Sequence, residues 1–291
     1  MSNQHPTTSP GVSASVPHAE HDWARQARTF LFVPGTRPDR FERARDSGAD
    51  AIIVDLEDAV EPAAKDTARS HAASWLQTAE RSIVRINAAD SPWFTADLEA
   101  LRTLDPQVVL LPKVESPTDI TQVTDALTPG TSVIACIETA LGLHRVCSVL
   151  DEAPVTRLAL GNMDLARDLG VSPNDGPLLD QAGVILVLES RAHGLPQPVT
   201  GVTASLTDTD AVTRDAAHAA GLGFGGKVCI HPAQVAAAAA GFAPTATDVA
   251  WAQRILAADD GSGVAQVDGQ MVDKPVTDRA IAILRRAGLN N

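Results

Sequence analysis

Short apolar runs alternate with longer stretches of helical periodicity between residues 29 and 230. Each run is rich in β-branched residues and ends in polar or glycine residues, a pattern typical of repeated strand–helix units. The predicted helices include residues 37–47, 62–77, 117–127, 177–193 and 208–220. The predicted strands are residues 29–34, 51–56, 82–87, 108–113, 132–138, 155–160, 197–203 and 226–230.

The number of strands favours a closed sheet. Eight strands separated by helices fit a parallel (β/α)8 TIM barrel of the α/β class better than an open sheet, which usually has fewer strands and a glycine-rich first turn. No G-x-G-x-x-G motif follows the first predicted strand. The alanine run 236–240 reads as a helix interior.

The chain is expected to have three parts. Residues 1–22 are rich in Ser, Thr, Pro and His and lack the apolar centre of a signal peptide, which predicts a disordered tail and argues against export. Residues 23–244 form the predicted barrel. Residues 245–291 form a C-terminal helical extension, or lid, with helices at 245–258 and 275–287 around a glycine-containing segment, 259–270, that we expect to be mobile.

Composition excludes several classes of function. A hydrophobic content of 44% with 20% charged residues is typical of a globular protein, and no apolar run approaches the ~20 residues that cross a bilayer. A net charge of −13 and 3% aromatic residues argue against a nucleic-acid partner. Cys136, Cys147 and Cys229 lack C-x-x-C spacing, so we expect reduced, packed thiols and a cytoplasmic location.

Polar residues gather at the C-terminal ends of the predicted strands, where a TIM barrel places its active site. Any one of these charges could simply mark the point at which the chain meets water. The N-terminal strand ends carry no comparable set, so the coincidence over successive strands favours a site. The residues concerned are Asp55, Glu57, Asp58, Arg85, Asn87, Lys113, Glu115, Glu138, Asp164 and His231.

Glu138 and Asp164 are the candidate metal ligands. They follow adjacent strands and offer hard oxygen ligands, and Mg2+ accepts one or two protein carboxylates while it keeps waters that a substrate can displace. Zinc is disfavoured because no His or Cys cluster has ligand spacing. His231 stands alone in an IHP tripeptide, and we favour a structural role for it.

Arg85 and Lys113 are the candidate cationic groups for the substrate. Arg85 could hold a carboxylate with two parallel hydrogen bonds, or it could form a salt bridge to Asp55, Glu57 or Glu138 that only stabilises the mouth. Lys113 could bind an anion or pair with Glu115 or Glu138. We expect Asp58, Lys113 and Glu138 to take part in substrate binding beside Arg85.

The sequence resembles the citrate lyase β-subunit branch of the HpcH/HpaI aldolase family over most of residues 29–235. The order of DLEDAV, IET, DLA and IHP is a specific combination, much stronger than any one of these motifs alone. The matching stretches are FVPGTRPDRFERA (32–44), GADAIIVDLEDAVEPAAKDTAR (48–69), VRIN (84–87), LPKVES (111–116), IETALGL (137–143), LGNMDLARDLG (160–170) and GFGGKVCIHPAQV (223–235).

The resemblance implies a barrel that assembles as trimers or hexamers and binds Mg2+ through Glu138 and Asp164. It implies that Arg85 grips the carboxylate of an oxoacid, and that the reaction makes or breaks a bond between that oxoacid and an acyl thioester. The segment GQMVDKPVTDRAIAIL (269–284) looks like the lid of members that act on coenzyme A thioesters, in which the residue matching Asp273 is an acid/base in a neighbouring subunit's site. Without the resemblance, Asp273 reads as the N-cap of a helix or a solvated residue.

Two residues depart from the family pattern. Many relatives have Glu where this chain has Met163 and Asp where it has Thr200.

As a whole, the resemblance implies a Mg2+-dependent carbon–carbon lyase acting on a malyl-, citramalyl- or citryl-thioester. A thioesterase on the same substrates, a class II aldolase that uses pyruvate without coenzyme A, and a noncatalytic subunit of a lyase complex remain the alternatives.

Overall fold

The computed structural model describes residues 22–105, 107–173, 176–258, 265–267 and 269–289. The predicted disordered tail therefore lies, except for Asp22, outside the described residues. None of the helices in the described ranges combines the length and the apolar character that a membrane crossing requires.

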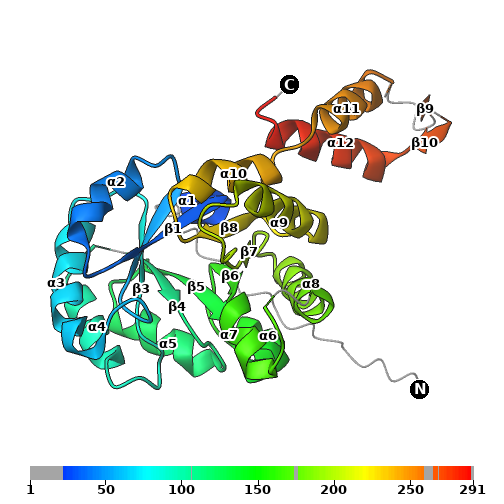
Figure 1. The fold of residues 1–291 in the computed structure, drawn as a ribbon. Coiled ribbons are helices and arrows are strands. Elements are labelled where there is room, and N and C mark those ends of the chain that lie inside the picture. The colour runs from blue at the N-terminus through cyan, green and yellow to red at the C-terminus, as the bar shows by residue number, and fades with distance from the viewer. Residues whose placement is uncertain (1–21, 106, 174–175, 259–264, 268, 290–291) are drawn as a thin grey trace, which may run out of the picture.

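Eight parallel strands close into a barrel in chain order, each paired with the next and the last with the first (Figure 1). The predicted TIM barrel is confirmed, as is each of the predicted strands. The strands are β1 (Thr29–Pro34), β2 (Ala51–Asp55), β3 (Ser82–Arg85), β4 (Val108–Leu111), β5 (Ser132–Ile137), β6 (Arg157–Leu160), β7 (Val199–Thr200) and β8 (Gly226–Cys229).

The seventh strand is much shorter than the predicted 197–203. The amide side chain of Asn162 accepts a hydrogen bond from the Val202 backbone N–H and donates one to the Val202 carbonyl, at 2.9 and 3.0 Å. A Cβ at Gly201 would lie 1.9 Å from the Asn162 side-chain oxygen, so only glycine allows this approach. The strand ends at Thr200 because a side chain has taken the backbone partners beyond it.

Helices surround the barrel between successive strands (Figure 1). The predicted helices and the alanine-rich one are present, and the structure adds α1, α4, α6 and α7. The elements are α1 (Asp22–Gln26), η2 (Pro38–Arg40), α2 (Phe41–Arg45), η3 (Pro62–Ala64), α3 (Lys65–Leu76), α4 (Phe94–Leu101), α5 (Pro117–Ala126), α6 (Ala140–Glu152), α7 (Asn162–Leu169), α8 (Gly176–Ala192), α9 (Thr209–Leu222) and α10 (Ala233–Phe242).

The alternation of side chains along each strand divides the core into two clusters. Ile52, Val54 and Val84 belong to the cluster between the strands and the helices, whereas Ile53 and Ile83 belong to the smaller cluster inside the barrel. A period of two continues the inner face to the C-terminal strand ends. It therefore brings the side chains that follow the inner residues to the mouth of the barrel.

The C-terminal extension has its own small core and projects from the barrel (Figure 1). It consists of α11 (Ala246–Ala258), the antiparallel strands β9 (Ala265–Val267) and β10 (Gln270–Val272), and α12 (Lys274–Arg286). Residues 259–264 and 268 of the segment expected to be mobile lie outside the described residues, and the hairpin beside them was not predicted.

The extension contacts the barrel at its N-terminal face. The Arg28 guanidinium, just before β1, donates to the carbonyl of Arg286 at 3.3 and 3.4 Å. The end of α12 is therefore held beneath the face opposite the mouth.

Candidate active site

Arg85 and Asp55 form a two-pronged ion pair across β2 and β3. The two residues are paired in the strand register, and Nε and Nη2 of Arg85 each lie 2.7 Å from a different oxygen of Asp55. Burial alone lowers the pKa of Arg85, but the neighbouring carboxylates raise it above its ordinary value, so the guanidinium remains charged. Of the two readings left open for Arg85, the salt bridge is the one present, and its role toward an oxoacid stays a proposal.

Glu57 joins Arg85 to Lys113. Its Oε1 accepts from Nζ of Lys113 at 2.9 Å, and its Oε2 lies 2.9 Å from Nη1 of Arg85. That contact lacks hydrogen-bond geometry, and Oε2 is buried without a hydrogen-bond partner among the described residues. Burial raises the pKa of Glu57, against the effect of both cations. The side chain of Lys113 thus pairs with Glu57, and not with Glu115 or Glu138 as expected. Asp58, next to Glu57 in the chain, is exposed.

Glu138 is held inside the mouth by backbone geometry. Lys113 adopts a φ of 50°, uncommon for a residue with a side chain, and its backbone N–H donates to Oε1 of Glu138 at 3.0 Å. The thiol of Cys136, one inner position earlier on β5, lies 3.4 Å from Oε2. A Cβ at Gly161 would lie 2.2 Å from the same oxygen. The position of Glu138 therefore requires glycine at 161.

The mouth carries an excess of negative charge around Glu138. Burial, with the charges of Glu57 and Asp164, raises the pKa of Glu138 to about 7, and Arg85 opposes the shift. Asp164 lies in the first turn of α7, with one oxygen 2.6 Å from the guanidinium of Arg167. Mutual repulsion among these carboxylates fits a divalent cation with hard oxygen ligands.

A buried network supports the loop after β2. Nζ of Lys65 donates to the carbonyls of Leu56 and Glu57 and to the side-chain oxygen of Asn87, at 2.7 to 2.8 Å. Asn87 in turn donates to the fully buried carboxylate of Asp97. Sequence reasoning missed Lys65 and Asp97, because nothing local marks a lysine or an aspartate as buried. The side chain of Asn87 is therefore part of this buried network and does not line the mouth beside Arg85.

Two further strand-end residues have structural partners. Nδ1 of His231 accepts from the backbone N–H of Ala233 at 3.2 Å at the start of α10, in line with the structural role favoured for it. Glu115 accepts from the hydroxyl of Thr139 at 2.7 Å, and that hydroxyl also caps α6.

Asp273 lies with the extension and away from the other candidate residues. Its carboxylate accepts from the backbone N–H of Val276 at 3.2 Å and caps α12. The other end of this 13-residue helix, about 20 Å away, contacts Arg28 beneath the barrel. The expected role of Asp273 as a helix N-cap is thus observed, and its role as an acid/base stays a proposal.

Met163 and Thr200, the two departures from the family pattern, line one cavity of about 330 Å3. Met163 stands beside Asp164 in α7 and is 40% exposed, and Thr200 ends β7. Asn162 and Thr203 also line this cavity. Met163 and Thr200 therefore belong to one continuous surface next to a candidate metal ligand.

The thiols divide by burial. Cys136 and Cys229 are buried, as expected of packing residues, but Cys147 is exposed, so that expectation was wrong for it. It lies on α6, on a face turned away from the barrel core, and the sequence pattern did not predict its exposure.

Comparison with known proteins places the chain among its relatives. The model of the HpcH/HpaI aldolase/citrate lyase family matches residues 28–232. The chain is 37% identical to a (3S)-malyl-CoA thioesterase of Cereibacter sphaeroides over 86% of this chain and 90% of that protein. It is 36% identical to a citrate lyase subunit beta-like protein of Mycobacterium tuberculosis, over 89% and 95% respectively.

A solved structure is similar over nearly the whole fold. The protein CitE of Mycobacterium tuberculosis, in complex with magnesium, acetoacetate and coenzyme A, superposes with a TM-score of 0.82 at 35% identity, over 91% of this chain and 99% of that one. The resemblance inferred from the motifs is confirmed: the chain belongs to the HpcH/HpaI aldolase/citrate lyase family.

Proposed function

We propose that this chain is a Mg2+-dependent carbon–carbon lyase that cleaves, or forms, a 3-hydroxyacyl-coenzyme A such as malyl-, citramalyl- or citryl-CoA. The observation that carries the proposal is the buried Glu138, whose pKa is raised by Glu57 and Asp164 at the mouth of the barrel. The presence of magnesium, acetoacetate and coenzyme A in the similar CitE structure supports it.

Glu138 and Asp164 would hold the cation, which when bound would act as a Lewis acid on the oxygen that becomes a carbonyl. Lys113 is one-third exposed, so its ammonium is within reach of an anionic substrate. Arg85 is 14% exposed and is fixed by Asp55, which pre-orients its remaining N–H groups toward an oxoacid carboxylate. Asp58, exposed beside them, completes the polar rim.

Asp273 would serve the active site of a neighbouring subunit. Within its own chain, the C-terminal end of α12 contacts Arg28 at the N-terminal face of the barrel, and the rest of the helix lies outside the barrel, so the N-terminal end that Asp273 caps is away from its own mouth (Figure 1). We propose a homotrimer or hexamer in which Asp273 protonates the thioester enolate left by cleavage, or removes the α-proton in condensation.

Thioester hydrolysis is the second candidate function. It is favoured by the 37% identity to a protein named (3S)-malyl-CoA thioesterase. The same groups would bind the substrate, and water would attack the thioester carbon in place of carbon–carbon cleavage. The cavity lined by Met163 and Thr200 could redirect the reaction or the choice of acyl group.

Product analysis separates these functions. The purified protein is incubated with malyl-, citramalyl- and citryl-CoA with and without Mg2+, beside a Glu138→Gln variant. A lyase gives free oxoacid and acyl-CoA, whereas a thioesterase gives free hydroxyacid and coenzyme A. Folded protein that turns over none of these thioesters but forms a stable complex with a lyase partner would instead support a noncatalytic subunit.

A further inference from the structure

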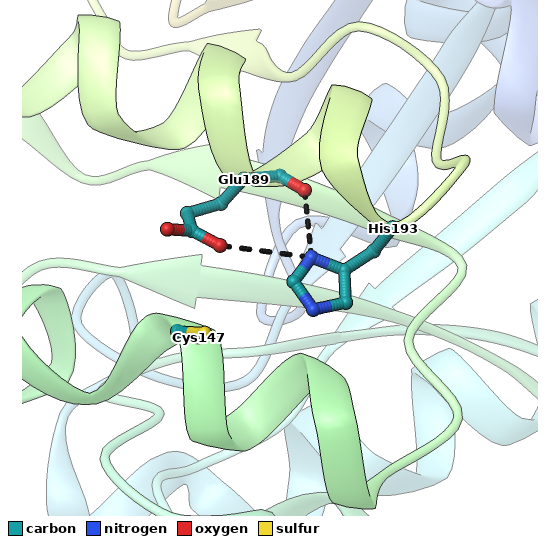
Figure 2. A group of neighbouring side chains, drawn as sticks. All are labelled: Cys147, Glu189 and His193. Carbon is teal, nitrogen blue, oxygen red and sulfur yellow. Dashed lines mark hydrogen bonds and ion pairs between the residues drawn. The ribbon is translucent and has the colours of Figure 1, made fainter. Parts of the chain in front are cut away.

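A second group of metal-ligating side chains lies on the outside of the barrel, on α6 and α8. Cys147 and Asp151 are four residues apart on α6. Glu189 lies in the last turn of α8 and His193 directly follows the helix, with its backbone N–H still bonded to the Glu189 carbonyl at 3.1 Å. This spacing places each pair on one face of its helix. The two helices are neighbours, and the two faces meet, as Figure 2 shows for Cys147, Glu189 and His193. These four residues are called the α6–α8 cluster below.

The distances within the cluster suit a single small cation. One ligand atom each of Cys147, Glu189 and His193 lies within 4.8 Å of the others. Asp151 joins from the α6 side, with Oδ1 3.0 Å from Nε2 of His193 and Oδ2 3.8 Å from Sγ of Cys147. Four ligands at ~2.0–2.3 Å from one ion in a tetrahedron stand a little over 3 Å apart. The Glu189 carboxylate lies 3.6 Å from Nδ1, so it must rotate to share an ion with Nε2.

The imidazole of His193 is already oriented for ligation. Its Nδ1 donates to the backbone carbonyl of Glu189 at 2.9 Å and lies 3.6 Å from the carboxylate of the same residue. Nε2 lies 3.0 Å from Oδ1 of Asp151, so without an ion both ring nitrogens face acceptors and the doubly protonated ring is the form that fits. A lone pair opposite a carboxylate oxygen is repulsive unless a proton or a cation lies between them. A metal-ligating histidine likewise donates its other nitrogen to a carbonyl, so a cation could take the place of the proton between Nε2 and Asp151.

The charges of the cluster call for a cation. The carboxylates of Glu189 and Asp151 lie against the His193 ring, and that of Asp151 also lies 3.8 Å from the Cys147 sulfur. A bound divalent cation would offset both carboxylates and favour the thiolate.

We propose that the α6–α8 cluster binds Zn2+ or a similar thiolate-accepting divalent ion, and joins the two helices. The ligand set of one sulfur, one imidazole nitrogen and two carboxylate oxygens suits zinc, whereas Glu138 and Asp164 at the mouth of the barrel offer the hard oxygens that suit Mg2+. The two sites differ in ligand chemistry and lie on different faces of the fold. On binding, the Cys147 thiol loses its proton to solvent, together with any second proton on His193.

Cobalt titration of the full-length protein, freed of metal, tests this proposal. Co2+ bound to a thiolate gives a charge-transfer absorption in the near ultraviolet, and we expect one Co2+ per chain to give it and one equivalent of Zn2+ to remove it. Cys147→Ser should abolish this band, and His193→Ala should weaken Co2+ binding about tenfold or more. Proton release on Zn2+ binding should be smaller in Cys147→Ser than in wild type.

His144→Ala is the matched control for His193→Ala. His144 is an exposed histidine on the same helix as Cys147 but outside the cluster. It should titrate as wild type, and the melting temperatures of the metal-free variants show that all are folded. No thiolate band in wild type, or equal binding by the His144 and His193 variants, would overturn the proposal and leave a protonated His193 paired with Asp151 and Glu189.

Discussion

Gly161 provides the space that the carboxylate of Glu138 occupies: a methyl group on Gly161 would lie 2.2 Å from Oε2. The glycine follows β6 and the glutamate follows β5, and the backbone N–H of Gly161 bonds to the Ile137 carbonyl at 3.0 Å. The two strand ends are thus locked together where the metal ligand is placed. A change at 161 acts on Glu138 without removing any functional group.

Gly161→Ala should therefore impair Mg2+ binding. The new Cβ displaces Glu138 or the backbone, which costs about 1–3 kcal/mol of stability and lowers Mg2+ affinity about tenfold or more. The Mg2+ dependence of activity and the melting temperature measure the two effects. Gly221→Ala is the control, because a Cβ there meets no atom within 4 Å, and helix stability should rise by about 0.5–1 kcal/mol. Equal behaviour of both variants would contradict the packing account.

Mg2+ affinity should increase as the pH rises through about 7. Glu138 must lose its proton to bind a cation, and its pKa in the folded protein is about 7. For the metal-free protein the sign is opposite. Because the folded pKa lies above the unfolded value of about 4.3, the folded state binds the extra proton, and its stability falls as the pH rises between the two values.

Calorimetric titration with Mg2+ and thermal unfolding across this pH window check both trends. Glu138→Gln has no proton to lose, so it should flatten the pH dependence of unfolding and abolish tight Mg2+ binding. An affinity independent of pH in the wild-type protein would show that Glu138 is not a ligand.

Arg85→Lys should reduce activity although it keeps the positive charge. An ammonium cannot make the two parallel bonds to Asp55 and reach Glu57 as well. Loss of one buried charge-assisted hydrogen bond costs about 1.5–3 kcal/mol, which corresponds to about a 10- to 150-fold fall in kcat/KM if the guanidinium also binds substrate.

Arg37→Lys is a matched control, because Arg37 forms the same two-pronged pair with Asp39 on the surface, where both side chains are at least 44% exposed. Its effect on stability should be near zero. If Arg85→Lys lost stability but kept full kcat/KM, Arg85 would be confined to holding the mouth together.

Asp273→Asn separates the two roles of this residue. Asparagine caps a helix about as well as aspartate, so stability should not change, whereas loss of a general acid/base should lower kcat about 10²- to 10⁴-fold. Asp273→Ala should add a loss of about 1 kcal/mol from the missing cap. Steady-state kinetics measure kcat and thermal unfolding measures the stability of both variants. Full activity of Asp273→Asn would show that Asp273 only caps the helix.

Mixed oligomers test whether Asp273 acts on a neighbouring subunit. Asp273→Asn and Glu138→Gln are each expected to be inactive alone. If the two residues of one active site come from different chains, co-refolded mixtures should regain part of the activity. Mixtures as inactive as the parents would argue for a site within one chain.

The barrel and its mouth could be predicted because they follow from local periodicity. Along β2 and β3 the inner positions run from Ile53 to Asp55 and from Ile83 to Arg85, so the same alternation that fills the core delivers the charges to the mouth. Closure of eight parallel strands then brings together residues far apart in the chain. Residues Glu138 and Asp164 could be singled out for this reason.

Other features depend on pairings that periodicity does not encode. Nothing in the sequence around Lys65 shows that its ammonium reaches two carbonyls of the loop after β2 and the side-chain oxygen of Asn87 after β3. The truncation of β7 depends on the Asn162 side chain, and the meeting of Cys147 with His193 depends on how α6 packs against α8. These relationships are set by tertiary packing, so only the three-dimensional arrangement reveals them.

The most direct test of a metal site at the barrel mouth is X-ray diffraction, at the manganese absorption edge, from crystals grown with Mn2+ and an oxoacid. We predict an anomalous peak between the carboxylates of Glu138 and Asp164, absent from crystals of Glu138→Gln. A bound oxoacid without a peak between these two side chains, or a peak unchanged in Glu138→Gln, would contradict the assignment.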